Sequence, residues 1–386
     1  MSAERPSGTA RASAVIDLDA LAANLARVRG LVAPAVVIAV VKAEAYGHGA
    51  ADIARALRAE GVDLLAVALP EEALALRAAG DSGRLLAWLW APGDPAVGEC
   101  VASGVELGVS SRWALDDVVA GARAAGRTAV IHLKADTGLW RNGAAPRDWP
   151  HLVDLAAQAQ RDGTVRVAGL WSHLADGEVA ASASAQEQEA AFRQACDVAQ
   201  AAGISAQLRH LGNSGSAWTQ PQWDFEAVRS GIALYGLTPG TSLGTPAALG
   251  LVPVMTLRAR LAHVKAIPAG ARVSYGGTWA APVDTTVGLV PLGYADGIPR
   301  TAGGVIEVAI AGRRVPIVGR VAMDQFVVDL GPHASDMPGD EVVLFGPGTG
   351  GELTADEWAE RTGTIGYEIV TRISARVPRE YVGGDR

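Results

Sequence analysis

Residues 36–50 read VVIAVVKAEAYGHGA: the body of an apolar run that begins at Ala35, a single lysine, and a short polar segment that leads toward a helix. An apolar run this short and rich in valine is typical of a buried strand. Lys42 stands where this strand should end. A lysine walled by apolar side chains loses hydration of its ammonium, so its pKa falls and its amine becomes a nucleophile or a base near neutral pH. The alternative is a strand-end lysine that extends its ammonium to water.

From Asp19 to residue 234, short apolar runs alternate with alanine-rich, amphipathic segments. Several of these segments end at glycine, which predicts helices, although the interval around Trp218 has only a weak helical pattern. Eight strand and helix units fit an α/β fold, a (β/α)8 TIM barrel of roughly 250 residues. An open doubly wound sheet is the alternative, but no G-x-G-x-x-G motif follows the first strand. The candidate strands cover residues 35–41, 63–69, 84–90, 105–110, 128–136, 165–174, 205–214 and 228–234.

The pattern changes beyond Gly250. Short alternating runs cut by glycine and proline predict a mainly antiparallel β domain, interrupted by one helix that starts near Thr354. Glycine, proline and serine cluster at residues 238–250, which indicates a linker. We therefore expect the barrel to cover residues 13–245 and the C-terminal β domain to cover residues 246–386.

Composition limits the partners and the location of the protein. The formal net charge of −8 gives no reason to expect nucleic acid or an anionic membrane as a partner. No apolar run approaches the ~20 residues that span a bilayer, and the N-terminus has no apolar signal segment. Cys100 and Cys196 are too few for a disulfide framework, which favours a reducing cytoplasm. We expect no metal site, because His48, His173 and His210 are dispersed and no H-E-x-x-H or C-x-x-C motif occurs.

Functional side chains gather at the predicted carboxyl ends of five strands, where the chemistry of such barrels takes place. Residues with only structural roles would be scattered, so this joint placement predicts a catalytic site. The residues are Lys42 and Tyr46; Lys134, Asp136 and Arg141; His173; His210, Asn213 and Ser214; and Arg229 and Gly231.

Two of these strand ends suit a phosphate group. Ser214 follows the seventh strand, and glycine at position 231, after the eighth, lets the backbone approach a ligand closely. The same residues are common in ordinary turns. The sequence has no G-x-x-x-x-G-K-[ST] motif for a nucleoside triphosphate and no G-x-S-x-G elbow of a hydrolase. A phosphate site together with a strand-end lysine makes pyridoxal 5'-phosphate a plausible cofactor.

Nine segments together resemble, in order, those of the alanine racemase family. The resemblance runs from about Ile16 to Tyr381. It implies a pyridoxal-phosphate barrel followed by a β domain, and a homodimer in which the β domain of one chain closes the active site of the other. The segments are VVKAEAYGHGA, HLKADTGLWRNG, WSHLA, RHLGNSGSA, VRSGIALYG, VSYGGT, PLGYADGIPR, VGRVAMDQ and GTIGYEIVTRISARVPREY.

The resemblance implies a pair of bases on opposite faces of the substrate α-carbon. Lys42 would hold the cofactor covalently and act on one face, and Tyr275 from the partner chain would act on the other. Racemisation needs both, because one base removes a proton and the other returns a proton from the far side. A phenol with its usual pKa of ~10 needs help in this role, and the family pattern implies a hydrogen-bonded string through His173.

Further roles are implied for the remaining motif residues. Arg229 would face the pyridine nitrogen of the cofactor, with His210 in support, and a guanidinium that only donates hydrogen bonds would leave this nitrogen unprotonated. Lys134 matches a lysine that can be carbamylated in the family, whereas a plain ammonium there would repel Arg141. Cofactor binding is assigned to Tyr46, Arg141, Asn213, Ser214, Gly231, Ile232 and Tyr367, and binding of the substrate carboxylate to Arg141 and to the amide of Met323 from the partner chain.

The sequence also departs from the family pattern. Glu44, Ser230 and Ala322 replace other residues, and the HLADGE loop is short. We expect Glu44 to point away from Lys42, because a carboxylate beside the amine would raise its pKa. Trp140 either packs away from the site or reshapes it.

The predicted activity is the interconversion of L- and D-alanine, which supplies D-alanine for peptidoglycan. The alternatives are a racemase for serine or a larger amino acid, and a non-catalytic carrier of the cofactor. The segments around Tyr275 and Met323 disfavour a carrier, because a carrier has no use for a second base.

Overall fold

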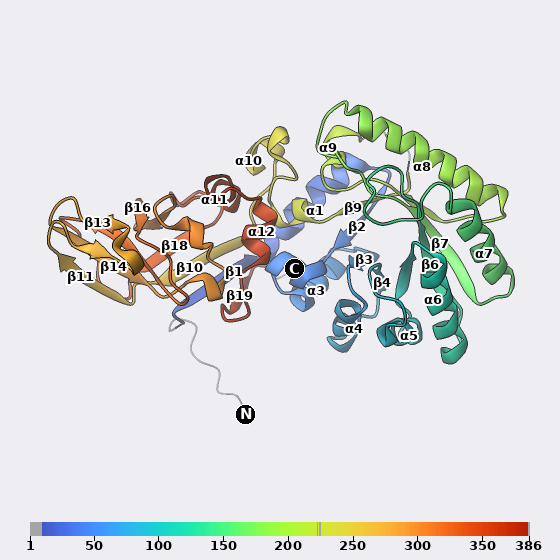
Figure 1. The fold of residues 1–386 in the computed structure, drawn as a ribbon, viewed down its shortest axis with the longest axis horizontal. Coiled ribbons are helices and arrows are strands. Elements are labelled where there is room, and N and C mark those ends of the chain that lie inside the picture. The colour runs from blue at the N-terminus through green and yellow to red at the C-terminus, as the bar shows by residue number, and fades with distance from the viewer. Residues whose placement is uncertain (1–9, 222, 224, 385–386) are drawn as a thin grey trace.

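A computed structural model of the chain describes residues 10–221, 223 and 225–384. Its two large sheets lie toward opposite ends of an elongated molecule (Figure 1). An eight-stranded sheet surrounded by helices forms one end, and a nine-stranded sheet forms the other. Within the described ranges, no helix is both long enough and apolar enough to cross a bilayer.

The eight-stranded sheet confirms the predicted barrel. All of its pairings are parallel, in the order β8-β7-β6-β5-β4-β3-β2-β9. The amide of Arg229 donates to the carbonyl of Gly212 at 3.0 Å, which joins the β8 and β9 ends and nearly closes the barrel. The alternative prediction of an open doubly wound sheet is therefore wrong. The strands are β2 (Val36–Val40), β3 (Leu64–Val67), β4 (Arg84–Ala87), β5 (Glu106–Val109), β6 (Ala129–Lys134), β7 (Val165–Trp171), β8 (Leu208–His210) and β9 (Ala227–Ser230).

The last barrel strand differs from its prediction. Strand β9 begins one residue earlier than predicted and ends at Ser230. The following residues, predicted to continue the strand, form the 3-10 helix η1 (Ile232–Tyr235). All four of them are buried. A short apolar run has the same pattern in a buried strand and in a buried helical turn, so periodicity could not separate the two.

Helices cover the outside of the barrel, as their amphipathic spacing predicted. Helix α1 begins after Asp17, whose carboxylate accepts the amide of Ala20 at 2.9 Å, and α6 ends at Gly126 in the left-handed conformation. The weak helix of the seventh interval is a single turn, α9. These helices are α1 (Leu18–Val32), α3 (Ala50–Ala59), α4 (Pro70–Ala78), α5 (Pro95–Ala102), α6 (Arg112–Ala125), α7 (Trp149–Arg161), α8 (Ala183–Ala201) and α9 (Ser216–Thr219).

The nine-stranded sheet confirms the C-terminal β domain and also includes the start of the chain. Its order is β11-β14-β17-β16-β15-β18-β10-β1-β19, and each pairing is antiparallel except that of β1 with β19. Strand β1, which lies inside the range predicted for the barrel, pairs in this sheet, and the bounds of the two domains stay predictions. Its six residues, ASAVID, are too few and too small to show a clear alternation. The strands are β1 (Ala12–Asp17), β10 (Met255–Arg260), β11 (His263–Ile267), β14 (Thr285–Val290), β15 (Glu307–Ile310), β16 (Arg313–Val318), β17 (Phe326–Gly331), β18 (Glu341–Phe345) and β19 (Arg379–Val382).

Short elements complete the C-terminal half. The helix predicted near Thr354 is confirmed as α11 (Ala355–Thr362), which Thr354 and Glu357 cap reciprocally. The helix α12 (Gly366–Thr371), which was not predicted, contacts the segment that follows β2. The boundary near residue 245 stays a prediction. The other elements are η2 (Thr241–Leu243), α10 (Pro246–Leu249), the hairpin of β12 (Arg272–Val273) and β13 (Trp279–Ala280), η3 (Tyr275–Gly277), η4 (Tyr294–Asp296) and η5 (Arg300–Ala302).

Candidate active site

Lys42 leaves strand β2 through a left-handed turn. In the segment α2 (Lys42–Gly47), the residues Ala43, Glu44, Ala45 and Tyr46 have φ between 51° and 55°. This conformation costs an L residue about 1–2 kcal/mol. Four such residues in succession persist only where the surrounding structure fixes them, and backbones of this kind cluster at functional sites.

Glu72 of helix α4 fixes the turn. Its Oε1 accepts the amide of Ala43 at 2.5 Å, and its Oε2 accepts the amides of Ala68 and Leu69 at 2.9 and 3.0 Å. The carboxylate thereby connects the carboxyl ends of β2 and β3. Sequence reasoning missed this residue, because a glutamate in the first turn of a helix is common and carries no functional signal of its own.

Glu44 points away from Lys42, as expected. Its carboxylate accepts the amide of Ala50 at 3.2 Å, at the start of helix α3. The unexpected acidic residue thus serves the next helix and leaves the amine of Lys42 free of a carboxylate partner on this side.

The carboxyl ends of the barrel strands surround a cavity of about 330 Å³. The structure brings together in its lining almost all of the predicted cofactor site, with His210 buried directly behind. The predicted residues that line it are Lys42, Tyr46, Lys134, Arg141, His173, Asn213, Ser214, Arg229, Gly231, Ile232 and Tyr367. A neighbouring chamber of about 480 Å³ shares Lys42, Lys134 and Arg141 and is walled by Trp88, Trp90 and Trp113.

Both lysines of the cavity are held with lowered pKa values. Burial lowers the pKa of Lys42, the charge of Arg141 lowers it further, and the charge of Glu72 opposes the shift. For Lys134, burial and then the charges of Arg229 and Arg141 lower the pKa to about 7. Its Nζ lies 4.2 Å from the centroid of the Trp171 ring. Each amine is therefore more available as a nucleophile or base than a surface lysine would be.

Arg229 lines the cavity and is otherwise surrounded by neutral acceptors. Its Nη1 donates to the carbonyl of His210, and its Nη2 donates to the carbonyls of Ser172 and Leu211 at 2.7 and 3.1 Å. Nη1 also lies 3.0 Å from Nδ1 of His210, and Nη2 lies 3.3 Å from Nδ1 of His173. Burial lowers the pKa of Arg229 to about 9.

Polar groups that suit a phosphate line one part of the cavity, around Ser214, Gly231 and Tyr46. The amide of Gly231 donates to Oγ of Ser214 at 2.9 Å. A Cβ on Gly231 would lie 2.2 Å from the hydroxyl oxygen of Tyr46, so only glycine fits there. The ring of Tyr46 lies 6.2 Å from that of Tyr367, and burial raises the pKa of both phenols. Both hydroxyls therefore remain protonated donors. The residues present thus fit the phosphate end of the predicted cofactor.

Tyr275 and Met323 do not line this cavity. Their exposed fractions are 72% and 53%. The η3 turn that carries Tyr275 is fixed by Ser274, which has φ of 62° and donates from Oγ to the carbonyl of Arg320 at 2.6 Å. Strand β13, two residues beyond this turn, lies at the end of the molecule opposite the barrel (Figure 1). The single chain therefore presents both side chains outward.

Trp140 neither packs nor reshapes the cavity. Its side chain is 73% exposed, its φ is 55°, and its amide donates to Oδ1 of Asp136 at 3.1 Å. The prediction that Trp140 packs away from the site is therefore wrong within one chain, and Trp140 does not line the cavity. The HLADGE loop instead contributes Glu178 to the cavity lining. The carbonyl of Glu178 accepts the hydroxyl of Ser242 at 3.2 Å, which attaches this loop to the linker.

Aromatic residues are the main part of the lining that the sequence did not reveal. Trp171 is the last residue of strand β7, two positions before His173, and Trp88 directly follows strand β4, whose end contributed no predicted site residue. An inward tryptophan and a core tryptophan have the same sequence signature, so only their position at a strand end could have indicated them.

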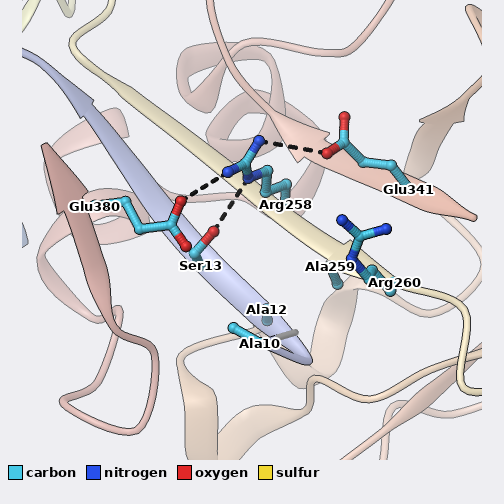
Figure 2. Close-up of a pocket in the computed structure, with 8 residues that line it drawn as sticks. All are labelled: Ala10, Ala12, Ser13, Arg258, Ala259, Arg260, Glu341 and Glu380. Carbon is cyan, nitrogen blue, oxygen red and sulfur yellow. Dashed lines mark hydrogen bonds and ion pairs between the residues drawn. The ribbon is translucent and has the colours of Figure 1, made fainter. Parts of the chain in front are cut away.

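A separate polar pocket of about 190 Å³ lies in the nine-stranded sheet. Figure 2 shows Arg258 at its centre, donating to Glu380 at 2.7 Å and to Ser13 at 3.1 Å and paired with Glu341 at 3.4 Å. Its lining holds no lysine and no histidine. Arg258 pairs with both glutamates of the lining, and Arg260 donates to the carbonyl of Gly339 at 3.0 Å. These contacts join strand β1 to its neighbours, so we assign the pocket a structural role.

Comparisons with known proteins agree with the geometry. The chain matches the family models of the alanine racemase N-terminal domain over residues 16–239 and of the alanine racemase C-terminal domain over residues 254–381. It is 50% identical over 377 residues to the alanine racemase of Streptomyces coelicolor, with 96% of each chain covered. The crystal structure of alanine racemase from Streptomyces lavendulae matches with a TM-score of 0.95 at 50% identity, covering 98% of both chains. An alanine racemase of Clostridium difficile matches with a TM-score of 0.90 at 32% identity, over 97% of this chain and 96% of that one.

Proposed function

Because the chain belongs to the alanine racemase family, we propose that it interconverts L-alanine and D-alanine with pyridoxal 5'-phosphate bound in the barrel cavity. The observation that carries this proposal is the meeting of Lys42, Arg229 and the cradle at Ser214 and Gly231 around one cavity. A lysine amine, a buried donor and a phosphate cradle are what this cofactor needs at its aldehyde, its ring nitrogen and its phosphate.

The chain's own groups account for binding and orientation. When bound, the cofactor supplies the delocalisation of the charge that forms at the substrate α-carbon. Lys42, with its lowered pKa, has the amine that would bond to the aldehyde carbon. Ser214 and Tyr46 would hold the phosphate, and Arg229 would donate to the ring nitrogen, which then stays unprotonated. Arg141, exposed at the mouth, would bind the substrate carboxylate.

Proton transfer on two faces needs a second copy of the chain. Lys42 would move a proton on one face of the α-carbon, and Tyr275 of a partner subunit would move a proton on the other. The outward presentation of Tyr275 on a fixed turn supports this arrangement. The amide of Met323 donates to no other group in the described part of the chain, so it is available to a substrate carboxylate across the interface. The proposed assembly is thus a homodimer with shared active sites.

Lys134 offers a second covalent site. A neutral amine attacks the carbon of CO2, and loss of one proton from nitrogen leaves a carbamate anion. Its pKa of about 7 gives Lys134 a neutral fraction under ordinary conditions. We propose that the carbamate forms and positions Arg141, as the family resemblance implies. From the same family resemblance we also infer that the protein is a cytoplasmic enzyme that supplies D-alanine for peptidoglycan.

The test measures both the D-alanine that is formed and the deuterium that enters its α-carbon. Purified protein loaded with the cofactor is incubated with L-alanine in deuterated water, and products are separated by chiral chromatography with mass detection. We expect D-alanine with deuterium at the α-carbon, and less product from L-serine or larger amino acids. Absence of D-alanine at any protein concentration would overturn the proposal.

The cofactor link is tested separately. Borohydride reduction followed by peptide mapping should place the pyridoxyl adduct on Lys42. An adduct on Lys134 or Lys265 would refute the assignment, and Lys42→Ala provides the matched control.

A further inference from the structure

A string of four buried side chains crosses the inside of the barrel behind the cavity. Nε2 of His132 lies 2.7 Å from Oε2 of Glu106, Nδ1 of His132 lies 2.8 Å from Nε2 of His210, and Nδ1 of His210 lies 3.0 Å from Nη1 of Arg229. Both histidines have no exposed surface, and Glu106 and Arg229 are 4% and 5% exposed. The string connects strands β5, β6, β8 and β9.

Strand β7 leaves room for this string. It carries Gly169 beside His132, and a Cβ at this glycine would lie 2.1 Å from Nδ1 of His132. Farther along the same strand, the ring of Trp171 stacks on His210 with an interplanar angle of 14°, and its Nε1 donates to the carbonyl of His132 at 3.3 Å. Gly169 thus leaves room for the ring of His132, and the indole of Trp171 supports the ring of His210, so that the two imidazoles stay in contact.

The chemistry at the Glu106 end fixes the direction of the first hydrogen bond. Arg84 donates to both carboxylate oxygens, at 2.6 and 3.1 Å, and burial is outweighed by the hydrogen bonds from His132 and Arg84, which lower the pKa of Glu106 to about 2. An ionised carboxylate only accepts, so Nε2 of His132 must donate. Burial lowers the pKa of His132, so its ring is neutral and its Nδ1 is an acceptor.

The chemistry at the Arg229 end fixes the direction of the last hydrogen bond of the string, between Arg229 and His210. A guanidinium has no acceptor, so Nδ1 of His210 must accept from Arg229. Burial lowers the pKa of His210 well below its ordinary value, so the neutral ring carries its proton on Nε2, facing Nδ1 of His132. The two ends, considered independently, require the same direction at the bond between the histidines.

We infer that Glu106 and His132 are positioning residues, which lock His210 in the tautomer that accepts from Arg229 and transmit the charge of Glu106 to the guanidinium through two imidazoles. In the described chain, the groups that directly accept from Arg229 are backbone carbonyls and imidazole nitrogens, all uncharged. The relayed carboxylate therefore helps to keep Arg229 a donor. The contribution of this string to catalysis rests on the role proposed for Arg229. The direction of its hydrogen bonds does not depend on that role.

The direction can be measured in the unaltered protein. Histidine labelled with 15N gives separate signals for Nδ1 and Nε2 of each ring, and single substitutions assign the seven histidines. We expect His132 and His210 to be neutral at pH 7, each with its proton on Nε2. A proton on Nδ1 of either ring, or a doubly protonated ring, would overturn the inference.

Paired variants test the consequence. Glu106→Leu should give His210 a mixture of tautomers and should lower kcat roughly 10- to 100-fold with little change in KM, since a misdirected imidazole at a catalytic site is costly. Asp63→Leu removes the exposed carboxylate that pairs with the same Arg84 at 3.1 Å, and it should leave both measurements unchanged.

A further variant and the wild type complete the test. If Glu106→Leu does not fold, Gly169→Ala displaces His132 without removing a polar group and should give the same mixture. Equal activity of Glu106→Leu and Asp63→Leu would contradict the positioning role, whereas a wild-type protein that forms no D-alanine would contradict the proposed function instead.

Discussion

The barrel mouth and the far end of the nine-stranded sheet hold their functional groups in opposite ways. At the mouth, Lys134 and Arg229 are 5% exposed and have lowered pKa values. At the far end, Tyr275 is 72% exposed on a turn that Ser274 and two glycines shape. The contrast indicates that one chain supplies a preformed cofactor cavity but only one member of the proposed pair of bases.

The C-terminal segment nevertheless has a role in its own barrel. Arg379 of β19 donates from Nε and Nη2 to the carbonyl of Gly47, at 2.9 and 2.8 Å, and Tyr381 donates to the carbonyl of His48 at 3.1 Å. A Cβ on Gly47 would lie 2.3 Å from the carbonyl oxygen of Val370. The segment that closes the nine-stranded sheet therefore also supports the left-handed turn of Lys42 from behind.

The largest expected effect separates two lysines, one in each region. Lys42→Ala should reduce alanine racemisation roughly 10⁴-fold or more, because it removes both the covalent link to the cofactor and one base. Lys265→Ala, in the exposed strand β11 of the sheet, should leave the rate within about twofold of the wild type. The rate of D-alanine formation measures both, and a Lys42→Ala protein with wild-type turnover would place the chemistry elsewhere.

The second prediction tests whether the two regions act across subunits. Tyr275→Phe should lower turnover roughly 10²- to 10⁴-fold, since it removes one hydroxyl with a proton-transfer role. A residue at the far end of the sheet would then be needed for catalysis, as the residues of the cavity are. Circular dichroism checks folding, and exchange of the substrate α-proton with solvent, measured from each enantiomer, should fall unequally in the two directions.

Mixing the two inactive proteins sharpens this test. In a hybrid dimer of Lys42→Ala and Tyr275→Phe, one shared site receives both wild-type residues if tyrosine acts in trans. Random exchange of subunits should then restore about a quarter of the wild-type sites. No recovery of activity in a verified hybrid would show that tyrosine does not act in trans.

A smaller effect concerns stability. The pKa of Lys134 is lowered from its ordinary value of 10.5 to about 7 in the folded chain. Between these two pH values the unfolded chain therefore binds more protons than the folded chain. The free energy of unfolding should therefore rise with pH across this window, by up to about 1.4 kcal/mol per pH unit. Urea unfolding in CO2-free buffer measures this slope. Lys134→Met should lower it, Lys265→Met should keep it, and equal slopes in all three proteins would rule out the burial effect.

The sequence predicted the barrel and its site because both depend on short-range patterns. Alternating apolar runs and helical segments located the strands, and a barrel brings their carboxyl ends together whatever the lengths of the intervening segments. Residues such as Lys42 and His173 were therefore found from position alone. Their detailed roles came from the family resemblance.

The remaining features depend on three-dimensional contacts that no local pattern encodes. The left-handed turn is fixed by Glu72, a residue distant in sequence, and strand β1 pairs with β10 and β19, from the other end of the chain. Glu106 and His132 did leave a signal, since each is a titratable residue inside a strand with buried apolar neighbours. Which partner satisfies such a residue becomes clear only when neighbouring strands are aligned.

The smallest effect is expected at Trp140, which lies beside the barrel mouth and yet is exposed like the residues of the far sheet. Its φ of 55° is unfavourable for a tryptophan, and it is not among the residues that line the cavity. Trp140→Gly relieves this strain but frees the unfolded backbone, so the change in unfolding free energy should stay within about 1 kcal/mol. The ratio of alanine to serine turnover should not change. Arg141→Ala is the matched control at the adjacent position and should raise KM for alanine, because Arg141 lines the cavity. If Trp140→Gly alone altered substrate preference, the indole would have to reach a bound substrate, and in the assembled dimer the barrel mouth would differ from the single chain.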